Sequence, residues 1–464
     1  MTGQDPARPG LAPARPVPTR DHRRAVRVRL AALRADLLGT QRRLARTPGG
    51  VVRFRVLHRA FTLVASAPAI QHVLVANAPA YRRSRQHDNL ALTIGYGLIC
   101  SDGAVWRRQR RLAQPIFNRE LLARVVDVTA GRTEELLDRW ERAREHGEPV
   151  EIVAQMRELT MGVIAQALFG EDLPAPANVF TDTVDVALEV AIRRNILPVT
   201  LPVWVPTRLH RRLRRCRRAV DRYVYQRIDE RLRDDDGRQD ILAALIRGYG
   251  DQACRSRREL RDQVVTLFFA GFETTATALA WTWLLLDREE AVADRLHVEL
   301  AQVLGGRAPT VEDLAALPYT HQILQESMRI YPPVYTLTRR AAVADRIDGV
   351  DVRRGDSVIL PIHAAQCSAV LWDAPDEFRP QRFAPGRLTR AQRHAYAPFG
   401  AGARKCLGAG FATVEMATVL AVVAQRVRLR LIEGHPVAVS ATVTQYPTHG
   451  LAMRVERAAA GDRS

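Results

Sequence analysis

The sequence predicts a mainly α-helical protein with a small β portion, and three observations support this prediction. Over residues 121–286, apolar side chains recur at helical spacing in long stretches that contain few strand signals. Runs typical of strands are short and scattered, at residues 51–57 and 60–66, around Val352, at residues 358–362 and near the C-terminus. The 464 residues show no internal repeat and no flexible linker, so we expect a single domain over residues 24–464.

The start of the chain does not predict a packed structure. Five of the first twenty residues are prolines and no apolar run occurs there, so we expect a disordered leader over residues 1–23, with no signal peptide or membrane anchor. Over residues 24–46, apolar side chains recur at helical spacing among arginines, at Val26, Leu30, Leu33, Leu37 and Leu44. This pattern predicts an amphipathic helix that packs against the domain, with weak contact to an anionic membrane surface as the alternative.

The positive charge of the chain is concentrated in two stretches. Lys and Arg outnumber Asp and Glu by 69 to 50, and residues 1–60 and 207–222 together hold all but one unit of the net charge of +19. All of these cations except Lys405 are arginines, a bias typical of a GC-rich genome. Neither stretch interleaves aromatic residues as base-stacking platforms. We therefore interpret both as solvated faces, and a basic nucleic-acid-binding protein is only a distant alternative.

The cysteines exclude several classes of protein. The five cysteines form no C-x-x-C or clustered Cys/His pattern, which argues against a disulfide scaffold, a zinc finger or an iron–sulfur cluster. A reducing compartment fits best, so we expect a cytoplasmic location. The positions are Cys100, Cys216, Cys254, Cys367 and Cys406.

Residues 264–286 form an apolar run in which Glu273 is the single charged residue. The run is long enough to cross a bilayer, but a membrane span would place this carboxylate near mid-membrane. We therefore expect a buried central helix in which Glu273 has a polar role.

The most specific stretch is the sequence PFGAGARKCLG at residues 398–408. Its glycines let backbone N–H groups approach one sulfur closely, and Arg404 and Lys405 add positive charge. Both effects favour a thiolate, so Cys406 is expected to act as an anionic ligand or a nucleophile. No local signature of a cysteine protease accompanies it, and we interpret the other four cysteines as small buried hydrophobes.

The pattern Phe399-x-x-Gly402-x-Arg404-x-Cys406-x-Gly408 resembles the haem-binding loop of the cytochrome P-450 superfamily, the haem-thiolate monooxygenases. The resemblance extends from about residue 51 to the C-terminus, because three further motifs follow in the family's order. It implies the cytochrome P-450 fold of the soluble bacterial type, with haem between a long central helix and the cysteine loop. It also implies haem b, whose iron has Cys406 as axial ligand.

The second motif joins Glu326 and Arg329, three residues apart on one helix face, to Arg382 in the segment FRPQRF at residues 378–383. The spacing alone is weak, since Glu141 and Arg144 repeat it on a helix expected at the surface. The family resemblance implies a buried Glu-Arg-Arg network, so we assign these three residues to the fold and not to catalysis.

The third motif is AGFETT at residues 270–275, which resembles the family's oxygen-activation motif. The Ala270–Gly271 pair removes side-chain bulk, so that a small ligand can lie between helix and haem. Glu273 and Thr274 are the expected catalytic residues, as an acid and an alcohol that relay protons. The alternative for Thr274 is a bond to its own helix backbone.

The fourth motif places Trp106 and Arg110 in the family's W-x-x-x-R pattern, which holds haem propionates. Arg340 and Arg404 stand at two further positions where the resemblance implies a propionate contact, because arginine suits bonds to carboxylates. Surface charge is the alternative for Arg110 and Arg340. Gln366 departs from the family, where a histidine is common, and this affects the detail of its loop only.

The resemblance implies a monooxygenase that inserts one oxygen atom of O2 into a hydrophobic small molecule by hydroxylation or epoxidation. Three segments expected near the haem, residues 89–99, 268–274 and 334–337, are mostly apolar, which favours a terpenoid, fatty acid or polyketide of bacterial secondary metabolism. A haem-thiolate peroxygenase or isomerase is the alternative, and the Glu273–Thr274 pair speaks against it.

We expect no fused redox domain, so electrons from NAD(P)H would arrive through a separate ferredoxin or flavodoxin and its reductase. Residues 106–111 together with Arg404 and Lys405 would form a positive patch for this acidic partner. We also expect a monomer.

Overall fold

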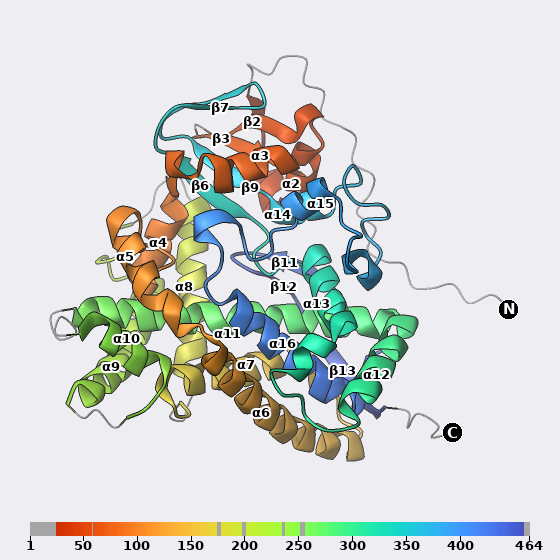
Figure 1. The fold of residues 1–464 in the computed structure, drawn as a ribbon. Helices are drawn as coiled ribbons and strands as arrows, with labels where there is room; N and C mark the ends of the chain where they lie inside the picture. Colours follow the sequence, from red (N-terminus) through yellow and green to blue (C-terminus); the bar gives the residue numbers. More distant parts are fainter. Residues whose placement is uncertain are drawn as a thin grey trace.

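The computed structural model describes residues 25–57, 59–173, 178–196, 201–233, 237–250 and 256–458. Its α-helices are α1 Leu30–Ala35, α2 Leu37–Ala45, α3 Ala67–Gln71, α4 Arg85–Ile94, α5 Gly103–Ala113, α6 Arg119–Glu145, α7 Ile152–Phe169, α8 Asn178–Ile196, α9 Arg208–Arg233, α10 Ile241–Tyr249, α11 Arg257–Arg288, α12 Glu290–Leu304, α13 Pro318–Ile330, α14 Ile362–Gln366, α15 Arg390–Ala395 and α16 Ala409–Ala424. Its strands are β1 Val26–Arg27, β2 Val51–Val56, β3 Arg59–Val64, β4 Tyr81–Arg83, β5 Val150–Glu151, β6 Leu337–Ala341, β7 Asp345–Ile347, β8 Val350–Val352, β9 Ser357–Leu360, β10 Val427–Leu431, β11 Val439–Ala441, β12 Gln445–Pro447 and β13 Ala452–Arg457. A strand-rich part stands above a larger helical part in Figure 1, so the mainly α architecture is confirmed.

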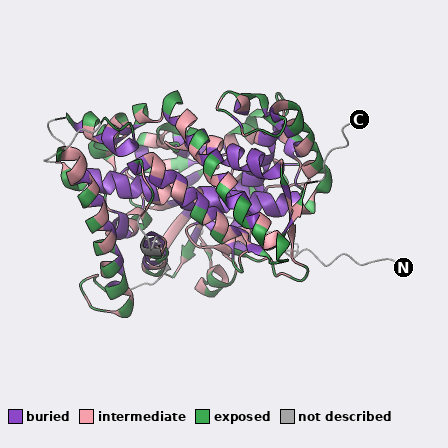
Figure 2. Cartoon of the chain, turned by 90° about the horizontal axis from the view of Figure 1, so that it is seen from below, coloured by how far each residue is buried: buried purple, intermediate pink, exposed green. Residues whose placement is uncertain are grey.

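The apolar run at residues 264–286, predicted as a central helix, lies in α11, which crosses the middle of the helical part (Figure 1). Helices α7, α9, α13 and α16 pack against it, and Figure 2 shows it as a largely buried rod. Among the described residues, α11 is the one helix with the length and hydropathy to span a membrane, and 72% of its most apolar window is buried in the protein. Burial on this scale is that of a core helix.

The main sheet has the strand order β1-β2-β3-β9-β6-β4. The antiparallel pair β2 and β3 confirms the two predicted strand runs at residues 51–57 and 60–66. Strands β4 and β6 were not predicted, because each carries two adjacent arginines that hide the alternation of apolar and polar residues. They pair in a register that sets Arg83 opposite Arg339 and Arg82 opposite Arg340, which becomes important at the site.

The prediction of one amphipathic helix over residues 24–46 is wrong in two respects. Residues Val26–Arg27 form β1, which runs parallel to β2. The remainder divides into α1 and α2 at Asp36, whose carboxylate accepts a hydrogen bond of 2.7 Å from the Gly39 N–H and so caps α2. The expected packing against the domain is present, since Leu44 is buried in a cluster with residues of β2 and β3. The predicted leader, residues 1–23, lies outside the described residues.

The arginine-rich stretch 207–222 lies largely in the first half of α9. Apolar side chains at helical spacing form a seam on its inner face, where Leu213, Cys216, Val220 and Val224 are buried and Leu209 is partly buried. Cys100 and Cys367 are buried too, while Cys254 lies outside the described residues. Seven of the eight arginines in this stretch are exposed and so face away from the core.

Candidate active site

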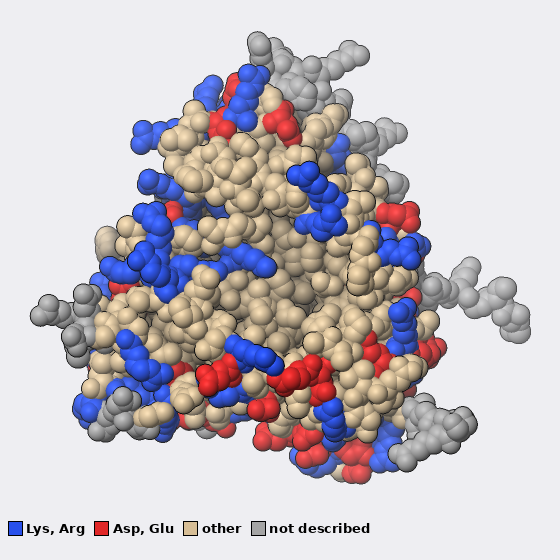
Figure 3. Space-filling view, viewed as in Figure 1, with Lys and Arg blue, Asp and Glu red and all other residues tan. Residues whose placement is uncertain are grey.

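A cavity of about 1490 Å³ lies between α11, the cysteine loop and strand β6. Helix α11 contributes Ala270 and Thr274, and the loop contributes Phe399, Gly400 and Cys406. The face drawn in Figure 3 is hollowed near its middle, and arginine and lysine side chains gather on the side where α4 and α5 lie. Trp106 and Arg110 line it too, so the cavity brings together the cysteine loop, the α11 motif and the W-x-x-x-R motif, three of the four that the sequence singled out.

The cysteine loop has a backbone that only particular residues can form. Gly400 and Gly402 have φ angles of +68° and +67°, a region that side chains disfavour. A Cβ at Gly402 would also overlap the carbonyl oxygen of Leu74, so the loop lies directly against the turn at residues 72–76. The Cys406 N–H donates to the Phe399 carbonyl at 2.8 Å, and this bond closes the loop around the sulfur.

Cys406 has exposed surface and lines the cavity. Burial raises the pKa of its thiol, while the Gly408 N–H and the charges of Arg110 and Lys405 act in the opposite direction without reversing the shift. The backbone amide and the two cations thus favour the thiolate, in the direction that the sequence predicted. A metal ion bonded to the sulfur would add further positive charge, because a coordinating thiol is deprotonated.

One wall of the cavity is crowded with buried cations. Burial lowers the pKa of Arg83 to about 9 and that of Arg339 to about 10, and nearby arginines add to both shifts. The pKa of His87 also lies well below its usual value, through burial and then the charge of Arg83. Asp102 is the nearby carboxylate, and it forms an ion pair with Arg404. The wall therefore carries more positive than negative charge and fits an anionic group.

The residues predicted to hold propionates do not all reach this wall. Trp106, Arg110 and Arg404 line the cavity, with the Arg404 guanidinium 4.0 Å above the Trp106 ring. Arg110 donates to the Lys405 carbonyl at 3.1 Å, which ties α5 to the cysteine loop.

The structure corrects the predicted role of Arg340, which does not line the cavity. It is exposed, whereas the adjacent Arg339 is 7% exposed and lines the cavity. Successive side chains on a strand point to opposite faces, so a shift of one residue moves an arginine from solvent to cavity. The sequence reasoning missed Arg339, Arg83 and His87. The cross-strand pairing of β4 with β6 is the signal that identifies the two arginines, and it exists only in the fold.

The two small residues of α11 that were expected to make room for a ligand, Ala270 and Gly271, both line the cavity. Gly271 has a second role in packing, because a Cβ there would lie 2.8 Å from the Ile164 side chain on α7. The absence of a side chain at Gly271 therefore also permits the close approach of α7 and α11.

Thr274 and Glu273 have different partners. The Thr274 hydroxyl donates to the Ala270 carbonyl at 3.0 Å, the local bond considered as its alternative role, and Thr274 also lines the cavity. The Glu273 carboxylate lies 3.0 Å from the Arg157 guanidinium on α7, and Arg157 also pairs with Asp185 on α8. Burial raises the pKa of Glu273 despite this partner. Glu273 is thus connected through Arg157 to the half-exposed Asp185.

The predicted Glu-Arg-Arg network is present. Arg329 donates to both Glu326 oxygens at 2.7 and 2.9 Å, and Arg382 donates to the same carboxylate at 3.2 Å. Glu326 and Arg329 are fully buried, so the loss of one partner would leave an uncompensated charge. Gln366, the departure noted in the sequence, accepts from the Ala397 N–H and donates to two carbonyls of α13. It therefore joins this helix to the segment before the cysteine loop.

A family model described as Cytochrome P450 matches residues 29–447. The chain belongs to the cytochrome P450 family. Cyclooctatin synthase from Streptomyces melanosporofaciens is 35% identical to this P450, and the match covers 83% of this chain and 84% of the relative. Cyclooctat-9-en-7-ol 5-monooxygenase from the same organism is 30% identical over 80% and 81%. The solved haem domain of cytochrome P450DA has the same fold, with a TM-score of 0.82 over 91% of this chain and 93% of that one at 24% identity.

These findings confirm the predicted family, fold and enzyme class. This P450 is a haem-dependent oxidoreductase, a monooxygenase that uses O2 and electrons from partner redox proteins. Its own residues fit haem on two independent observations. A cysteine just before the start of α16 has surface in the cavity, and the same cavity is lined by Arg83, Arg339 and Arg404, whose nearby carboxylate is Asp102.

Proposed function

We propose that this P450 hydroxylates or epoxidises an apolar terpenoid in bacterial secondary metabolism. The observation that carries the proposal is the set of apolar side chains that line the same cavity as Thr274, among them Leu90, Leu98, Ile99, Leu188, Phe269 and Val334. Such a lining binds a substrate by apolar contact and not by ion pairing. The name cyclooctat-9-en-7-ol 5-monooxygenase denotes oxidation of an unsaturated alcohol, which favours a terpenoid over a fatty acid or polyketide.

The residues that would hold haem b follow from the site. Cys406 would ligate the iron, while Phe399 and Gly408 shape the loop around that ligand. Trp106, Arg110 and Arg404 would hold the propionates, now with Arg339 in place of Arg340. Bound haem supplies the activation of O2, and the protein supplies position, protons and a dry pocket.

Proton delivery is the proposed role of Thr274 and Glu273. The Thr274 hydroxyl proton is engaged with the Ala270 carbonyl, so its oxygen lone pairs remain available to a donor in the cavity. Glu273 lines the cavity and is held by Arg157, so a rotation away from that partner would free a carboxyl with raised pKa to give its proton to a group in the cavity. Asp185, half-exposed, would keep the Arg157 guanidinium paired during that rotation, and water would return the proton to Glu273, since a guanidinium does not release its own.

Electrons would enter across the basic face of α5. Arg107, Arg111 and Lys405 are exposed and form no ion pair among the described residues, whereas Arg108 is paired with Glu259 at 2.6 Å. An acidic ferredoxin or flavodoxin, reduced by NAD(P)H through its reductase, fits this face. A cytoplasmic location, a monomeric state and one domain over residues 24–464 stay predictions.

One set of experiments tests the proposal. Reduced protein treated with CO should show the absorption band of a thiolate-ligated haem, and a pyridine adduct should identify haem b. Cyclic terpenes should then shift the spin state of the haem iron at lower concentrations than fatty acids or polyketides do. Oxygen from 18O2 should appear in the product when a ferredoxin, its reductase and NAD(P)H are present. Absence of the thiolate band, or turnover with peroxide as fast as with the full electron chain, would contradict the monooxygenase mechanism proposed here.

A further inference from the structure

Gln445, at the start of β12, is a buried polar side chain without a hydrogen-bond partner. It is 1% exposed, and neither its amide oxygen nor its amide nitrogen has a partner among the described residues. The hydroxyl of the neighbouring Thr444 is buried and unpaired in the same way, and both residues line the cavity. Because buried polar groups are costly to leave unpaired, three such atoms on adjacent residues of a cavity wall indicate a ligand that completes their hydrogen bonds.

The backbone around Gln445 is held in place, so the unpaired amide does not result from a loose loop. The Gln445 N–H donates to the Pro333 carbonyl at 2.9 Å, and the Gln445 carbonyl accepts from the Trp281 indole N–H at 2.7 Å. The Tyr335 hydroxyl donates to the Thr442 carbonyl at 2.6 Å. These bonds tie the strand to α11 and to the segment that leads into β6. The side-chain amide is therefore the part of Gln445 that is left for a ligand.

The bond to Trp281 also places Gln445 relative to Thr274. Trp281 follows Thr274 by seven residues, which corresponds to about 10 Å along α11. Ala278, which lies between them in the helix, lines the same cavity, as does Val334. A substrate bound at Gln445 can therefore extend along α11 towards Thr274, with the group that is bound remote from the carbon that is oxidised.

The chemistry of the amide distinguishes between classes of apolar substrate. An amide offers N–H donors and an oxygen acceptor, and the Thr444 hydroxyl can take either role. A hydroxyl both donates and accepts, so it can pair with the amide oxygen and the amide nitrogen. A carboxylate only accepts and would leave the amide oxygen unpaired, whereas a hydrocarbon would leave all three atoms unpaired. The site therefore fits an alcohol best.

We propose that Gln445, assisted by Thr444, binds a hydroxyl group that the substrate already carries, so that this P450 oxidises a terpenoid alcohol in preference to a terpene hydrocarbon. The inference rests on the proposed function and adds the feature by which the substrate is recognised. It places the reaction after a step that installs oxygen, either a cyclisation that ends in the capture of water or an earlier monooxygenation. The product then carries two oxygen functions.

The first test uses the haem-loaded full chain and two pairs of a terpene hydrocarbon and its hydrated alcohol, limonene with α-terpineol and cedrene with cedrol. The shift in spin state of the haem iron measures the affinity for each probe. Each alcohol should bind about tenfold more tightly than its hydrocarbon, because only the alcohol pairs with the buried amide. Equal affinities within both pairs would overturn the inference and leave the proposed function intact. Shifts with fatty acids and with none of the four terpenes would contradict the proposed function, and the inference with it.

The second test removes the amide. Gln445→Met keeps a side chain of similar size, and it should abolish the preference for the alcohols while the hydrocarbons bind as before. Gln263→Met is the matched control, because Gln263 is also 1% exposed with both amide atoms unpaired among the described residues, but does not line the cavity. This control should keep the wild-type preference. A preference that persists in Gln445→Met, or an equal loss in Gln263→Met, would overturn the inference. If Gln445→Met does not fold, the comparison of probes on the wild type decides.

Discussion

At the scale of single residues, position on a strand decides which arginine can serve the site. Arg339 and Arg340 are adjacent and chemically identical, yet only Arg339 lines the cavity. Burial lowers the pKa of Arg339, and the neighbouring Arg404 lowers it further, so an anion close to both would relieve their repulsion. The sequence alone offered no means to choose between the two.

We expect Arg339→Gln to weaken haem retention about tenfold, because it removes a buried charge-assisted bond to a carboxylate. Arg340→Gln is the matched control and should retain haem as the wild type does. Transfer of haem to an apo-globin acceptor, followed by absorbance, measures both rates. Equal loss rates in the two variants would show that Arg339 does not hold the cofactor.

The proposed role of Thr274 can be tested against Thr277, a second threonine of α11 that makes the same local hydrogen bond. We expect Thr274→Ala to lower the yield of product per NAD(P)H consumed by about tenfold, because delivery of protons in the cavity is impaired. Thr277 donates to the Glu273 carbonyl at 2.8 Å, as Thr274 does to Ala270, but does not line the cavity. Thr277→Ala should therefore leave coupling unchanged, and Thr274→Ser should preserve most of it. Unchanged coupling in Thr274→Ala would exclude the relay.

At the scale of elements, the cysteine loop depends on the segment that supports it. Gly402 packs on the turn at residues 72–76, and Asp345 on β7 secures the same turn by accepting from His72, Asn77 and Tyr81. The loop is therefore held from outside as well as by its own glycines.

We expect Gly402→Ala to cost about 2–4 kcal/mol, since the new Cβ meets backbone at a positive φ angle. Gly410→Ala is the control, because its Cβ would lie 3.6 Å from Leu122 within helix α16 and should be tolerated. Haem content and the midpoint of denaturant unfolding measure both. Full haem loading of Gly402→Ala would contradict the close approach.

Because Asp345 is ionisable, its contribution to the free energy of unfolding should depend on pH. Burial raises its pKa, but hydrogen bonds from Tyr81 and His72 outweigh that effect and lower the pKa to about 2. Because the folded value lies below that of the unfolded chain, ionised Asp345 stabilises the fold above about pH 4, and this is lost as the pH falls towards 2. We expect Asp345→Asn to cost about 1 kcal/mol at pH 7 after solvent screening. The difference from wild type should shrink in acid, and a constant difference across the range would contradict the assignment.

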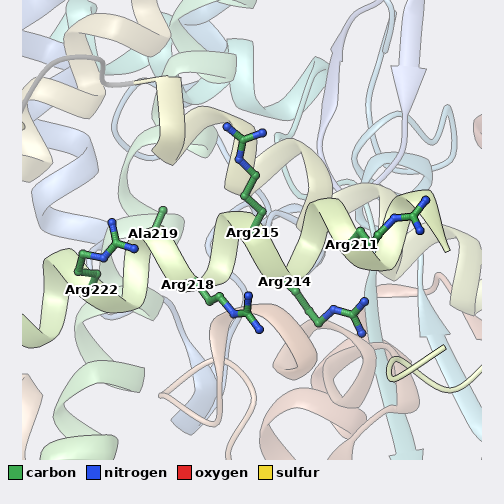
Figure 4. Close-up of a pocket in the computed structure, with 6 residues that line it drawn as sticks. All are labelled: Arg211, Arg214, Arg215, Arg218, Ala219 and Arg222. Atoms are coloured by element: carbon green, nitrogen blue, oxygen red, sulfur yellow. The ribbon is translucent and has the colours of Figure 1, made fainter. Parts of the chain in front are cut away.

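At the scale of the whole molecule, charge is distributed by face. The arginines of α5 lie beside the cysteine loop, whereas those of α9 lie on another helix (Figure 4), next to the segment that carries the exposed Trp204. The α5 face is therefore the one that adjoins the cysteine loop.

We expect Arg107→Glu/Arg111→Glu to slow reduction by an acidic redox partner by at least tenfold and to weaken its dependence on salt. Arg353→Glu/Arg354→Glu is the control, with the same change of charge in the exposed turn between β8 and β9. Stopped-flow measurement of haem reduction gives both rates. If the two variants are reduced equally fast with several acidic partners, the docking face lies elsewhere.

The sequence by itself determined the helical class and the central helix, since each depends on residues close in the chain, and its resemblance to a known family implied the cysteine loop and the Glu-Arg-Arg network. Tertiary structure alone decided which arginine faces the cavity, that Gly271 packs against α7 as well as lining the cavity, and that Asp36 divides the first helix. The physical reason is that strand register, burial and charge crowding arise between elements far apart in the chain, as where β4 pairs with β6. The local sequence pattern of either strand does not indicate that pairing.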